Sequence, residues 1–317
     1  MTPAKSIAEA YRYCRAIAHK HGANFSVGFR FLPRAKRRAV YAAYAYCRVA
    51  DDIADEGVGS WQLAVGSSEI SADCQLPTVN CRLVELDAWQ SELDAAYENR
   101  PTHPVTIALA DALLRFPIPK SAFIALIDGC RQDMVKTRYE TFEELLAYCD
   151  LVATSISDIS LAIYGYRTDA APRYGRNLAT ALQLTNVTRD IGDDLARDRV
   201  YVPQEELRRF GVEERELFER AENERVKALV EFQIARAKEY FRAAEPLLGE
   251  LSFDARFPTL LMGGVYATVL GKLEKDPLVV VRKRLSLSTT QKLLVVGSRM
   301  FRPHFIIEPL PQSGSGR

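Results

Sequence analysis

The sequence contains an apolar run that ends in carboxylates, Tyr41-Ala-Ala-Tyr44-Ala-Tyr-Cys-Arg48-Val-Ala-Asp51-Asp52-Ile-Ala-Asp55-Glu56. Four polar side chains in it follow one another at intervals of 4, 3 and 4 residues, which places them on one face of a helix. They are Tyr44, Arg48, Asp51 and Asp55. Asp51 and Asp55 lie one helical turn apart, where two carboxylates repel each other unless a cation lies between them. The segment therefore predicts a helix that carries a cation site at its end.

A second segment repeats this pattern: Gln183-Leu-Thr-Asn186-Val-Thr-Arg189-Asp190-Ile-Gly-Asp193-Asp194. Gln183, Asn186, Asp190 and Asp194 are spaced 3, 4 and 4 residues apart, and Arg189 and Asp193 form the neighbouring row. Oxygen ligands without His or Cys suit a hard cation, Mg²⁺ or Mn²⁺.

Arginines accompany the carboxylates in both segments. Arg48 and Arg189 have the planar guanidinium that grips phosphate oxygens. Two such stripes facing each other across a helical cavity would bind two diphosphates through bridging metal ions. The competing interpretation is a solvated charged face, and it is weakened because two acidic clusters occur, each with an arginine.

The composition is that of a globular protein. Of the 317 residues, 48% are hydrophobic and 26% charged, which excludes a disordered chain, a collagen and a coiled-coil rod. Lys and Arg number 42 against 41 Asp and Glu, so the net charge of +1 argues against a globally basic nucleic-acid-binding protein. We expect no nucleic-acid partner.

Helical periodicity runs through almost the whole chain, with prolines between the segments. We predict one all-α domain over residues 1–302, a long loop over 56–77 and a flexible tail over 303–317. Helices are expected at 4–20, 34–56, 79–98, 104–115, 119–136, 141–165, 170–197, 204–210, 213–246, 255–274 and 288–299.

Location is predicted from three features. The first 25 residues have no apolar signal region, the longest apolar span (Phe257 to Gly271) suits a buried core helix, and the six cysteines form no CxxC pair. We expect free thiols in a cytoplasmic protein, with a monomer favoured. The basic run Arg282-Lys-Arg284 is either a solvated helix end, a phosphate contact or a site that docks peripherally on the inner face of the membrane.

The two acidic segments belong to a longer series of motifs. These are Phe31-Leu-Pro33, Y-A-Y-C-R-V-A-D-D-I-A-D (44–55), T-R-Y-E-T-F-E-E-L-L-A-Y-C (137–149) and Q-L-T-N-V-T-R-D-I-G-D-D-L-A-R-D-R-V-Y-V-P-Q-E-E-L (183–207). With them, residues 10 to 300 resemble the squalene/phytoene synthase family of head-to-head prenyltransferases. The resemblance implies a single-domain helical bundle of the isoprenoid synthase type around a central apolar channel. It also implies that two prenyl diphosphates bind with Mg²⁺.

The resemblance assigns roles by position. Asp51 and Asp55 match the first metal site; Asn186, Asp190 and Asp194 match the second. The catalytic set is then Asp51, Asp55, Asp190, Asp194, Arg48 and Arg189. Tyr44, Arg48, Gln183, Arg189 and Tyr266 match diphosphate and substrate contacts. His21 matches a substrate contact, followed by Asn24 in an A-N-F run, and Phe25 and Phe29 would line the channel.

The implied reaction is a 1–1′ condensation through a cyclopropylcarbinyl diphosphate. Loss of a proton from two geranylgeranyl diphosphates gives phytoene, the favoured product. The alternatives use two farnesyl diphosphates and give squalene, presqualene diphosphate or dehydrosqualene, with NADPH needed only for squalene. Thr154 and Ser157 stand where the family usually has glycine, and they narrow or polarise the channel if they face it.

Two other classes of protein compete with this interpretation. A class I terpene cyclase or head-to-tail prenyltransferase also uses aspartate-rich helices and Mg²⁺, but the R-D-I-G-D-D motif and its context argue against it. A non-catalytic helical assembly factor would be expected to lose its metal carboxylates, and this chain keeps them.

Overall fold

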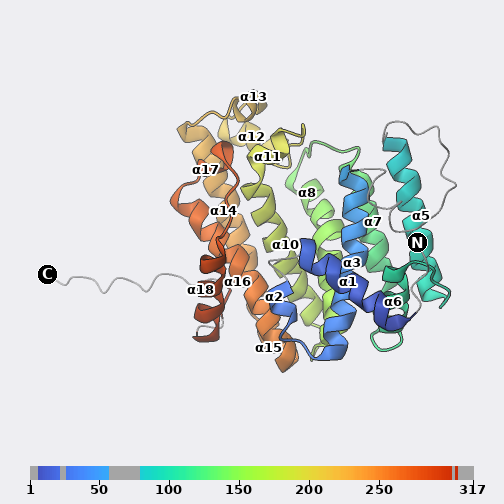
Figure 1. Cartoon of the computed structure of the whole chain (residues 1–317). Helices are drawn as coiled ribbons and strands as arrows, with labels where there is room; N and C mark the ends of the chain where they lie inside the picture. The colour runs from blue at the N-terminus through green and yellow to red at the C-terminus, as the bar shows by residue number, and fades with distance from the viewer. Residues whose placement is uncertain (1–5, 22–25, 57–78, 302–303, 306–317) are drawn as a thin grey trace.

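The protein is a bundle of helices (Figure 1). The computed structural model describes residues 6–21, 26–56, 79–301 and 304–305. Within these ranges every regular element is a helix, and only two isolated β-bridges occur, Arg138–Val200 and Tyr166–Leu251. The predicted all-α class is confirmed, while the predicted loop over 56–77 lies almost wholly outside the described residues.

The long helices, except the one that ends at Ala244, agree well with the predicted ranges, and α3 agrees end to end. They are α1 (Ile7–His21), α3 (Arg34–Glu56), α5 (Val79–Tyr97), α6 (Pro104–Leu113), α7 (Lys120–Asp133), α10 (Ala171–Arg189), α14 (Glu224–Ala244), α16 (Phe253–Lys275) and α18 (Thr289–Phe301).

Short helices account for most of the differences from prediction. The predicted helix 141–165 consists of α8 (Phe142–Cys149), a π-helical turn η1 (Asp150–Thr154) and α9 (Ser155–Tyr164). The predicted helix 170–197 is α10 followed by α11 (Ile191–Leu195). The remaining short elements are α2 (Ser26–Phe29), α12 (Gln204–Phe210), α13 (Glu214–Phe218), α15 (Leu247–Glu250) and α17 (Val279–Arg282).

The prediction of one helix over 213–246 is wrong, since the chain breaks between α13 and α14. Arg220 has a φ of 55°, in the left-handed region that stops a helix. Asn223 then starts α14, because its side chain accepts hydrogen bonds from the backbone N–H groups of Arg225 and Val226, both at 3.0 Å. Good helix formers on both sides hid this break in the sequence.

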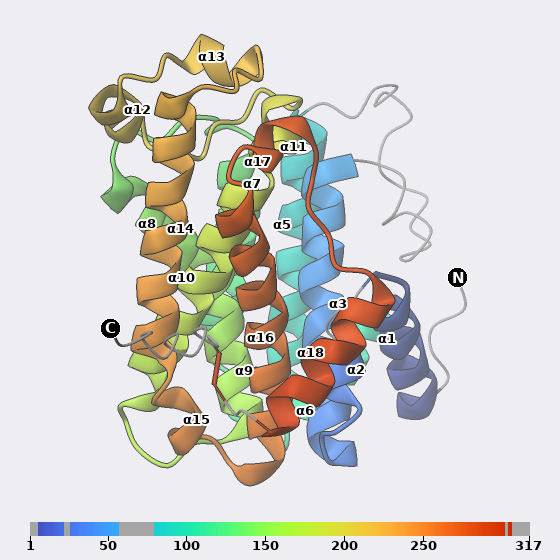
Figure 2. The same cartoon turned by 90° about the vertical axis from the view of Figure 1, so that its left-hand side faces the viewer.

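Helix α10 lies in the middle of the bundle. It packs along α14 and α16 on one side and against η1 and α9 on the other, and α9 also contacts α3 and α7. Helices α1, α5 and α6 cover α3. Figure 2 shows the end of α3 together with α11 and α17 at one end of the bundle, and α15 at the opposite end.

A fully buried aromatic group fixes α3 against α5 and α7. The rings of Tyr46 and Trp89 stack with their centres 4.8 Å apart, and the Phe123 ring packs edge to face with Tyr46 at a centre-to-centre distance of 5.1 Å. The indole N–H of Trp89 donates to the Tyr46 carbonyl at 3.1 Å, while the Tyr46 hydroxyl donates to the Trp89 carbonyl at 3.2 Å. Both polar groups are thus satisfied within the core, so this contact holds α3 in one position.

Two expectations about apolar segments and cysteines need correction. The longest apolar span was expected at Phe257 to Gly271, but among the described residues it is Phe142–Tyr164 that is long and apolar enough to cross a membrane by length and composition. Phe142–Tyr164 packs within the bundle against α7 and α10. Cys14, Cys47, Cys130 and Cys149 are free and buried, but Cys81 is disulfide-bonded, so the expectation of free thiols fails there.

The predicted tail over 303–317 falls mostly outside the described residues, with one exception. Phe305 is fully buried, its ring lies 6.4 Å from that of Phe241, and its backbone N–H donates to Glu245 at 2.7 Å. A Cβ on Gly263 would lie 2.4 Å from the Phe305 ring, so the glycine makes room for this contact. The chain therefore still packs on the bundle at Phe305.

Candidate active site

Carboxylates from α3 collect at the end of that helix. Asp51 accepts a hydrogen bond from the Cys130 thiol at 3.6 Å, and Asp55, 43% exposed, lies 3.9 Å from Arg199. Arg48 pairs with Asp52 instead of with the two predicted ligands. The structure thus places the predicted first metal pair on the helix face that looks toward α7 and the segment after α11.

The second group lies where α10 ends. Asp190 is the junction between α10 and α11, with φ −98° and ψ 9°, so the predicted continuous helix bends there. The carbonyl of Asp190 still accepts the backbone N–H of Asp194 at 2.8 Å, which keeps both side chains on one side of the chain. Asn186 donates its amide to the Gln183 side chain at 3.3 Å, one turn earlier.

Two arginines hold Asp190. Arg189 donates to both carboxylate oxygens, at 2.7 and 2.5 Å, and Arg284 does the same at 2.9 and 3.2 Å. Arg284 also lies 3.7 Å from Asp193. From the sequence, Arg284 was interpreted first as part of a solvated basic helix end. No local pattern in the sequence predicts that Arg284 contacts Asp190.

A close approach of two backbones brings Arg284 there. A Cβ on Gly192 would lie 2.8 Å from the carbonyl oxygen of Val280, nearer than real Cβ atoms come to other groups. Glycine at this position therefore lets α17 pack directly on α11. Arg282, at the start of the same basic run, pairs with Asp276 at 2.5 Å and with Glu222 at 3.6 Å.

Asp133 joins the two carboxylate groups. Its side chain accepts hydrogen bonds from the hydroxyls of Tyr148 and Tyr201, both at 2.8 Å, and its carbonyl accepts one from Arg199 at 3.0 Å. Arg199 in turn faces Asp55. The hydrogen bonds of Asp133, together with the Arg199–Asp55 contact, thus connect α7 and α8 with the end of α3 and the segment after α11.

Burial makes this end of the bundle unfavourable for negative charge. It raises the pKa of Asp51 to about 7, with Asp55 and Asp52 adding repulsion and Arg48 opposing it. Burial likewise raises the pKa of Asp194 to about 7, with repulsion from Asp190 and opposition from Arg199. Burial also raises the pKa of Asp133. A cation between these groups would relieve the repulsion.

The donors present fit a hard cation. The side-chain oxygen of Asn186, a predicted ligand, is buried and has no hydrogen-bond partner among the described residues. Within those same residues no group of three or more His, Cys, Asp or Glu side chains is arranged to hold a metal ion alone. Mg²⁺ characteristically takes one or two carboxylates and completes its shell with phosphate and water, so few protein ligands suffice.

An apolar pocket of about 150 Å³ adjoins these polar groups. Its walls come from η1, α9, α10, α15 and α16, and they include Leu182, Met262 and Tyr266. Tyr266 also lies in the electrostatic neighbourhood of Arg189 and Asn186, to which it is hydrogen-bonded. Tyr266 therefore stands where the apolar pocket meets the acidic end of α10, and its role as a substrate contact stays a prediction.

The two residues that replace family glycines differ in position. Ser157 lines the apolar pocket, and its Oγ packs where a Cβ on Gly175 would come within 2.6 Å. Thr154 is buried and donates to the Asp150 side chain at 2.9 Å. Ser157 thus faces the pocket, whereas Thr154 is tied to its own helical turn.

Only some of the residues predicted to line the channel near α2 belong to the described part of the structure. The ring of Phe29 lies 6.4 Å from Tyr44, and burial raises the pKa of Tyr44 to about 12. Asn24 and Phe25 lie outside the described residues, and the side chain of His21 does as well. Phe29 and Tyr44 therefore belong to one aromatic cluster on the α3 side.

The raised pKa of Asp51 predicts a pH-dependent stability. The folded protein keeps this proton up to about pH 7, whereas an unfolded Asp loses it near 3.8, so the free energy of unfolding falls as the pH rises from 4 to 7. In EDTA, Asp51→Asn should raise the unfolding free energy at pH 8 by up to about 4 kcal/mol. Denaturant titrations at pH 8 and pH 4 measure this, and equal effects at both pH values would contradict it.

Comparison with known proteins agrees with this geometry. The sequence profile of the squalene/phytoene synthase family matches residues 18–291. The chain is 33% identical over 309 residues to the 15-cis-phytoene synthase of Synechococcus elongatus, covering 94% of each chain. It is 34% identical over 297 residues to the phytoene synthase of Mycobacterium tuberculosis, covering 93% of this chain and 91% of that one.

Solved structures show the same fold. A squalene synthase from Alicyclobacillus acidocaldarius superimposes with a TM-score of 0.75 at 28% identity, over 85% of this chain and 95% of that one. A dehydrosqualene synthase in complex with a ligand superimposes with a TM-score of 0.75 at 24% identity, over 93% and 96% of the two chains, which supports the fold. On the family match and these identities, the chain belongs to the squalene/phytoene synthase family.

Proposed function

We propose that this enzyme joins two molecules of geranylgeranyl diphosphate head to head to form phytoene. The observation that carries the proposal is the placement of two carboxylate groups, at the ends of α3 and α10, beside an apolar pocket. The kinship to phytoene synthases at 33 and 34% identity supports the choice of product. The reaction releases two diphosphates and a proton.

Asp51 and Asp55 would hold one Mg²⁺, and Asn186, Asp190 and Asp194 another, with Mn²⁺ as the substitute. When bound, such an ion neutralises charge on a departing diphosphate. The donor set supports this assignment, since it consists of oxygen atoms only.

The arginines supply the remaining positive charge. Arg189 and Arg284 pair with Asp190, and Arg48 pairs with Asp52. A diphosphate with its cations offers each guanidinium a phosphate partner and each carboxylate a metal partner. Substrate binding is therefore an exchange of ion-pair partners, in which arginine forks turn toward the phosphate oxygens that accumulate charge as the allylic C–O bond breaks.

The apolar walls protect the carbocation that this ionisation produces. Pocket residues such as Leu178 and Met262 exclude water, and the ring faces of Tyr164 and Tyr266 are available for cation–π stabilisation. The double bond of the second chain then attacks the cation to form the cyclopropylcarbinyl diphosphate. A second ionisation, rearrangement and proton loss complete the sequence.

A second candidate product belongs to the squalene series, formed from two farnesyl diphosphates. The structural similarity to a squalene synthase at 28% identity favours it. Ser157 on the pocket wall also favours it, because a side chain there reduces the space available to a longer prenyl chain.

Location and assembly complete the proposal. We propose a cytoplasmic monomer that touches the membrane only peripherally, because its substrates and products are lipids. Cell fractionation and light scattering test these points separately from catalysis.

The product assay decides between the two substrates. Incubation of the purified enzyme with geranylgeranyl diphosphate and Mg²⁺ should give a C40 hydrocarbon of the mass of phytoene without NADPH. EDTA should abolish the reaction, and Mg²⁺ or Mn²⁺ should restore it. A C30 product formed only from farnesyl diphosphate would favour the squalene series, and a cyclised single unit would refute head-to-head condensation.

Asp190 and Asp193 offer a matched pair of carboxylates three residues apart. Asp190→Asn should lower turnover by about 100-fold or more, because it removes one of the two carboxylates expected to bind the second cation. Asp193→Asn, which changes a half-exposed side chain in the neighbouring row, should keep most of the turnover. Steady-state kinetics with circular dichroism as a fold control measure both. An equal loss of turnover in the two variants would contradict the assignment of Asp190 as a metal ligand.

Ser157 tests whether the pocket wall sets chain length. Ser157→Gly should shift the preference toward the longer diphosphate, because it opens space beside Gly175. Ser155→Gly is the control, since Ser155 hydrogen-bonds to the Leu151 carbonyl of its own helix and does not line the pocket. Both variants should lose about 0.5–1 kcal/mol of stability from glycine within a helix. Identical product profiles would exclude a role for Ser157 in selectivity.

A further inference from the structure

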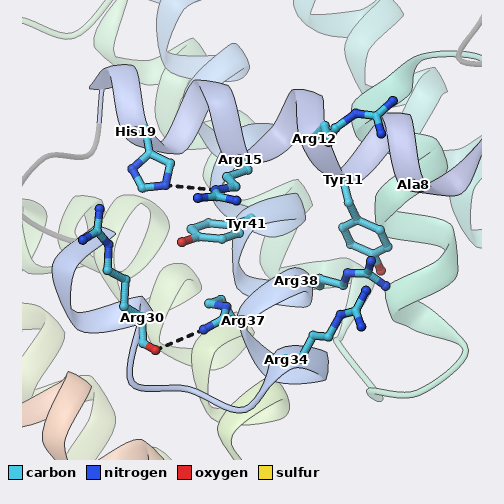
Figure 3. A pocket seen from close by; sticks show the side chains of 10 residues that line it. All are labelled: Ala8, Tyr11, Arg12, Arg15, His19, Arg30, Arg34, Arg37, Arg38 and Tyr41. Carbon is cyan, nitrogen blue, oxygen red and sulfur yellow. Dashed lines mark hydrogen bonds between the residues drawn. The ribbon is translucent and has the colours of Figure 1, made fainter.

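A pocket of about 450 Å³ lies between α1 and the start of α3, and it is lined by arginines (Figure 3). The buried ring of Tyr41 lies among them. The basic side chains come from three places: α1, the turn after α2, and the first two turns of α3. The arginines are Arg12, Arg15, Arg30, Arg34, Arg37 and Arg38, and we call this site the arginine pocket.

The positive charge in the arginine pocket is almost uncompensated. Of its six arginines, only Arg12 has a carboxylate within 4 Å among the described residues, namely Glu9 at 3.6 Å. Arg15 donates instead to the His19 ring nitrogen at 3.3 Å, and Arg37 to the Arg30 carbonyl at 3.1 Å. Guanidinium groups gathered in this way repel each other unless an anion joins them.

Arg38 contacts an aromatic ring instead of a carboxylate. Arg38 lies 4.9 Å from the centre of the Tyr11 ring. Asp111, which lines an adjacent pocket with Arg34 and Arg38, accepts the Tyr11 hydroxyl at 2.8 Å and has no ion pair with either arginine. Arg38 therefore contacts the Tyr11 ring and forms no ion pair with Asp111.

Helix α3 carries its charges in the order that opposes its own dipole. Its first turn has basic residues and no acid, and its last turn has acids and no base. A helix N-terminus favours negative groups and a C-terminus positive ones, so both ends are unfavourable as they stand. At the acidic end the expected partner is a cation; by the same reasoning the basic end calls for an anion.

Lys36 shows what a structural cation looks like in this region. It lies beside the pocket residues in sequence, but its ammonium donates to the Tyr164 carbonyl, the Ser252 hydroxyl and the Asp254 carboxylate, at 2.6 to 2.9 Å. The arginines of the pocket have no such set of acceptors. Their charge is therefore available to a ligand.

We propose that the arginine pocket binds a compact phosphate anion with at least two negative charges, at a site separate from the acidic end of the bundle. Arginine forks match phosphate oxygens in pairs, and His19 adds a further donor when protonated. Asp51 lies 17 residues beyond Arg34 on the same helix, which corresponds to about 25 Å. The proposal does not depend on the proposed function, because none of its residues belongs to the candidate active site.

Two kinds of ligand carry such a phosphate group: a free diphosphate and the phosphomonoester headgroup of an anionic lipid. Inorganic diphosphate is the first probe, used in EDTA so that no metal ion can carry it to the acidic end. Ionic strength is matched with NaCl. Binding to the folded protein alone should raise the melting temperature by about 4 °C at a hundredfold excess over Kd.

The variant Arg15→Gln/Arg34→Gln removes two charges of the pocket and should bind diphosphate at least tenfold more weakly by calorimetry. Within the described part of the chain neither residue has a carboxylate partner to lose, so the variant should fold. Arg208→Gln is the charge control, since Arg208 pairs with Glu140 outside the pocket. Equal binding of diphosphate by the double variant and the wild type, or no shift in melting temperature beyond that of NaCl, would exclude free diphosphate as the ligand of the arginine pocket.

His19 gives a local readout. Partial burial lowers its pKa, and the charges of Arg15 and Arg30 lower it further. A bound phosphate should raise this pKa in an NMR titration of the wild type and not in Arg15→Gln/Arg34→Gln. An unchanged pKa of His19 at saturating diphosphate would place the anion elsewhere.

Vesicles distinguish the two sources of phosphate. Wild type should sediment with phosphatidylcholine vesicles that contain phosphatidic acid, and not with phosphatidylcholine alone, if the headgroup is the ligand. Binding of free diphosphate without vesicle binding supports the soluble anion instead. If neither probe binds, or if the double variant sediments as well as the wild type and diphosphate does not bind, the arginine pocket is not a phosphate site.

Discussion

Repulsion between carboxylates at one end of the bundle is the constraint that the surrounding structure meets. Burial raises the pKa of Asp51 and Asp194, and repulsion from neighbouring carboxylates adds to the effect. Arginines from distant parts of the chain therefore converge on this end, including Arg199 and Arg284. Their ion pairs join α3, α11 and the segment after α17, so the charge balance of the site and the assembly of the bundle depend on one another.

Much of this arrangement could be predicted from the sequence. The 4, 3, 4 spacing of the polar residues in α3 identified the helix and its acidic face, because helical periodicity is a local property. The family resemblance alone pointed to Tyr266, as a substrate contact, and its contact with the acidic end of α10 was not predicted. The aromatic pair Tyr46 and Trp89, which holds α3 in place, was not foreseen, since it joins residues 43 apart.

The features that escaped prediction are those set by close approach between distant segments. Arg284 reaches Asp190 across 94 residues because Gly192 has no side chain to keep Val280 away. The break between α13 and α14 depends on the cap at Asn223 rather than on helix propensity. Backbone approach and capping geometry depend on the folded partner, which a local pattern does not contain.

The π-helical turn between α8 and α9 separates two tasks within one long helical segment. Before it, Tyr148 meets Asp133; after it, Ser157 meets the pocket. A π turn contains an extra residue, and one extra residue rotates everything that follows by about 100°. Residues 150–154 therefore change the direction in which the side chains after them point. They allow the polar network and the apolar wall to differ in orientation although a single segment carries both.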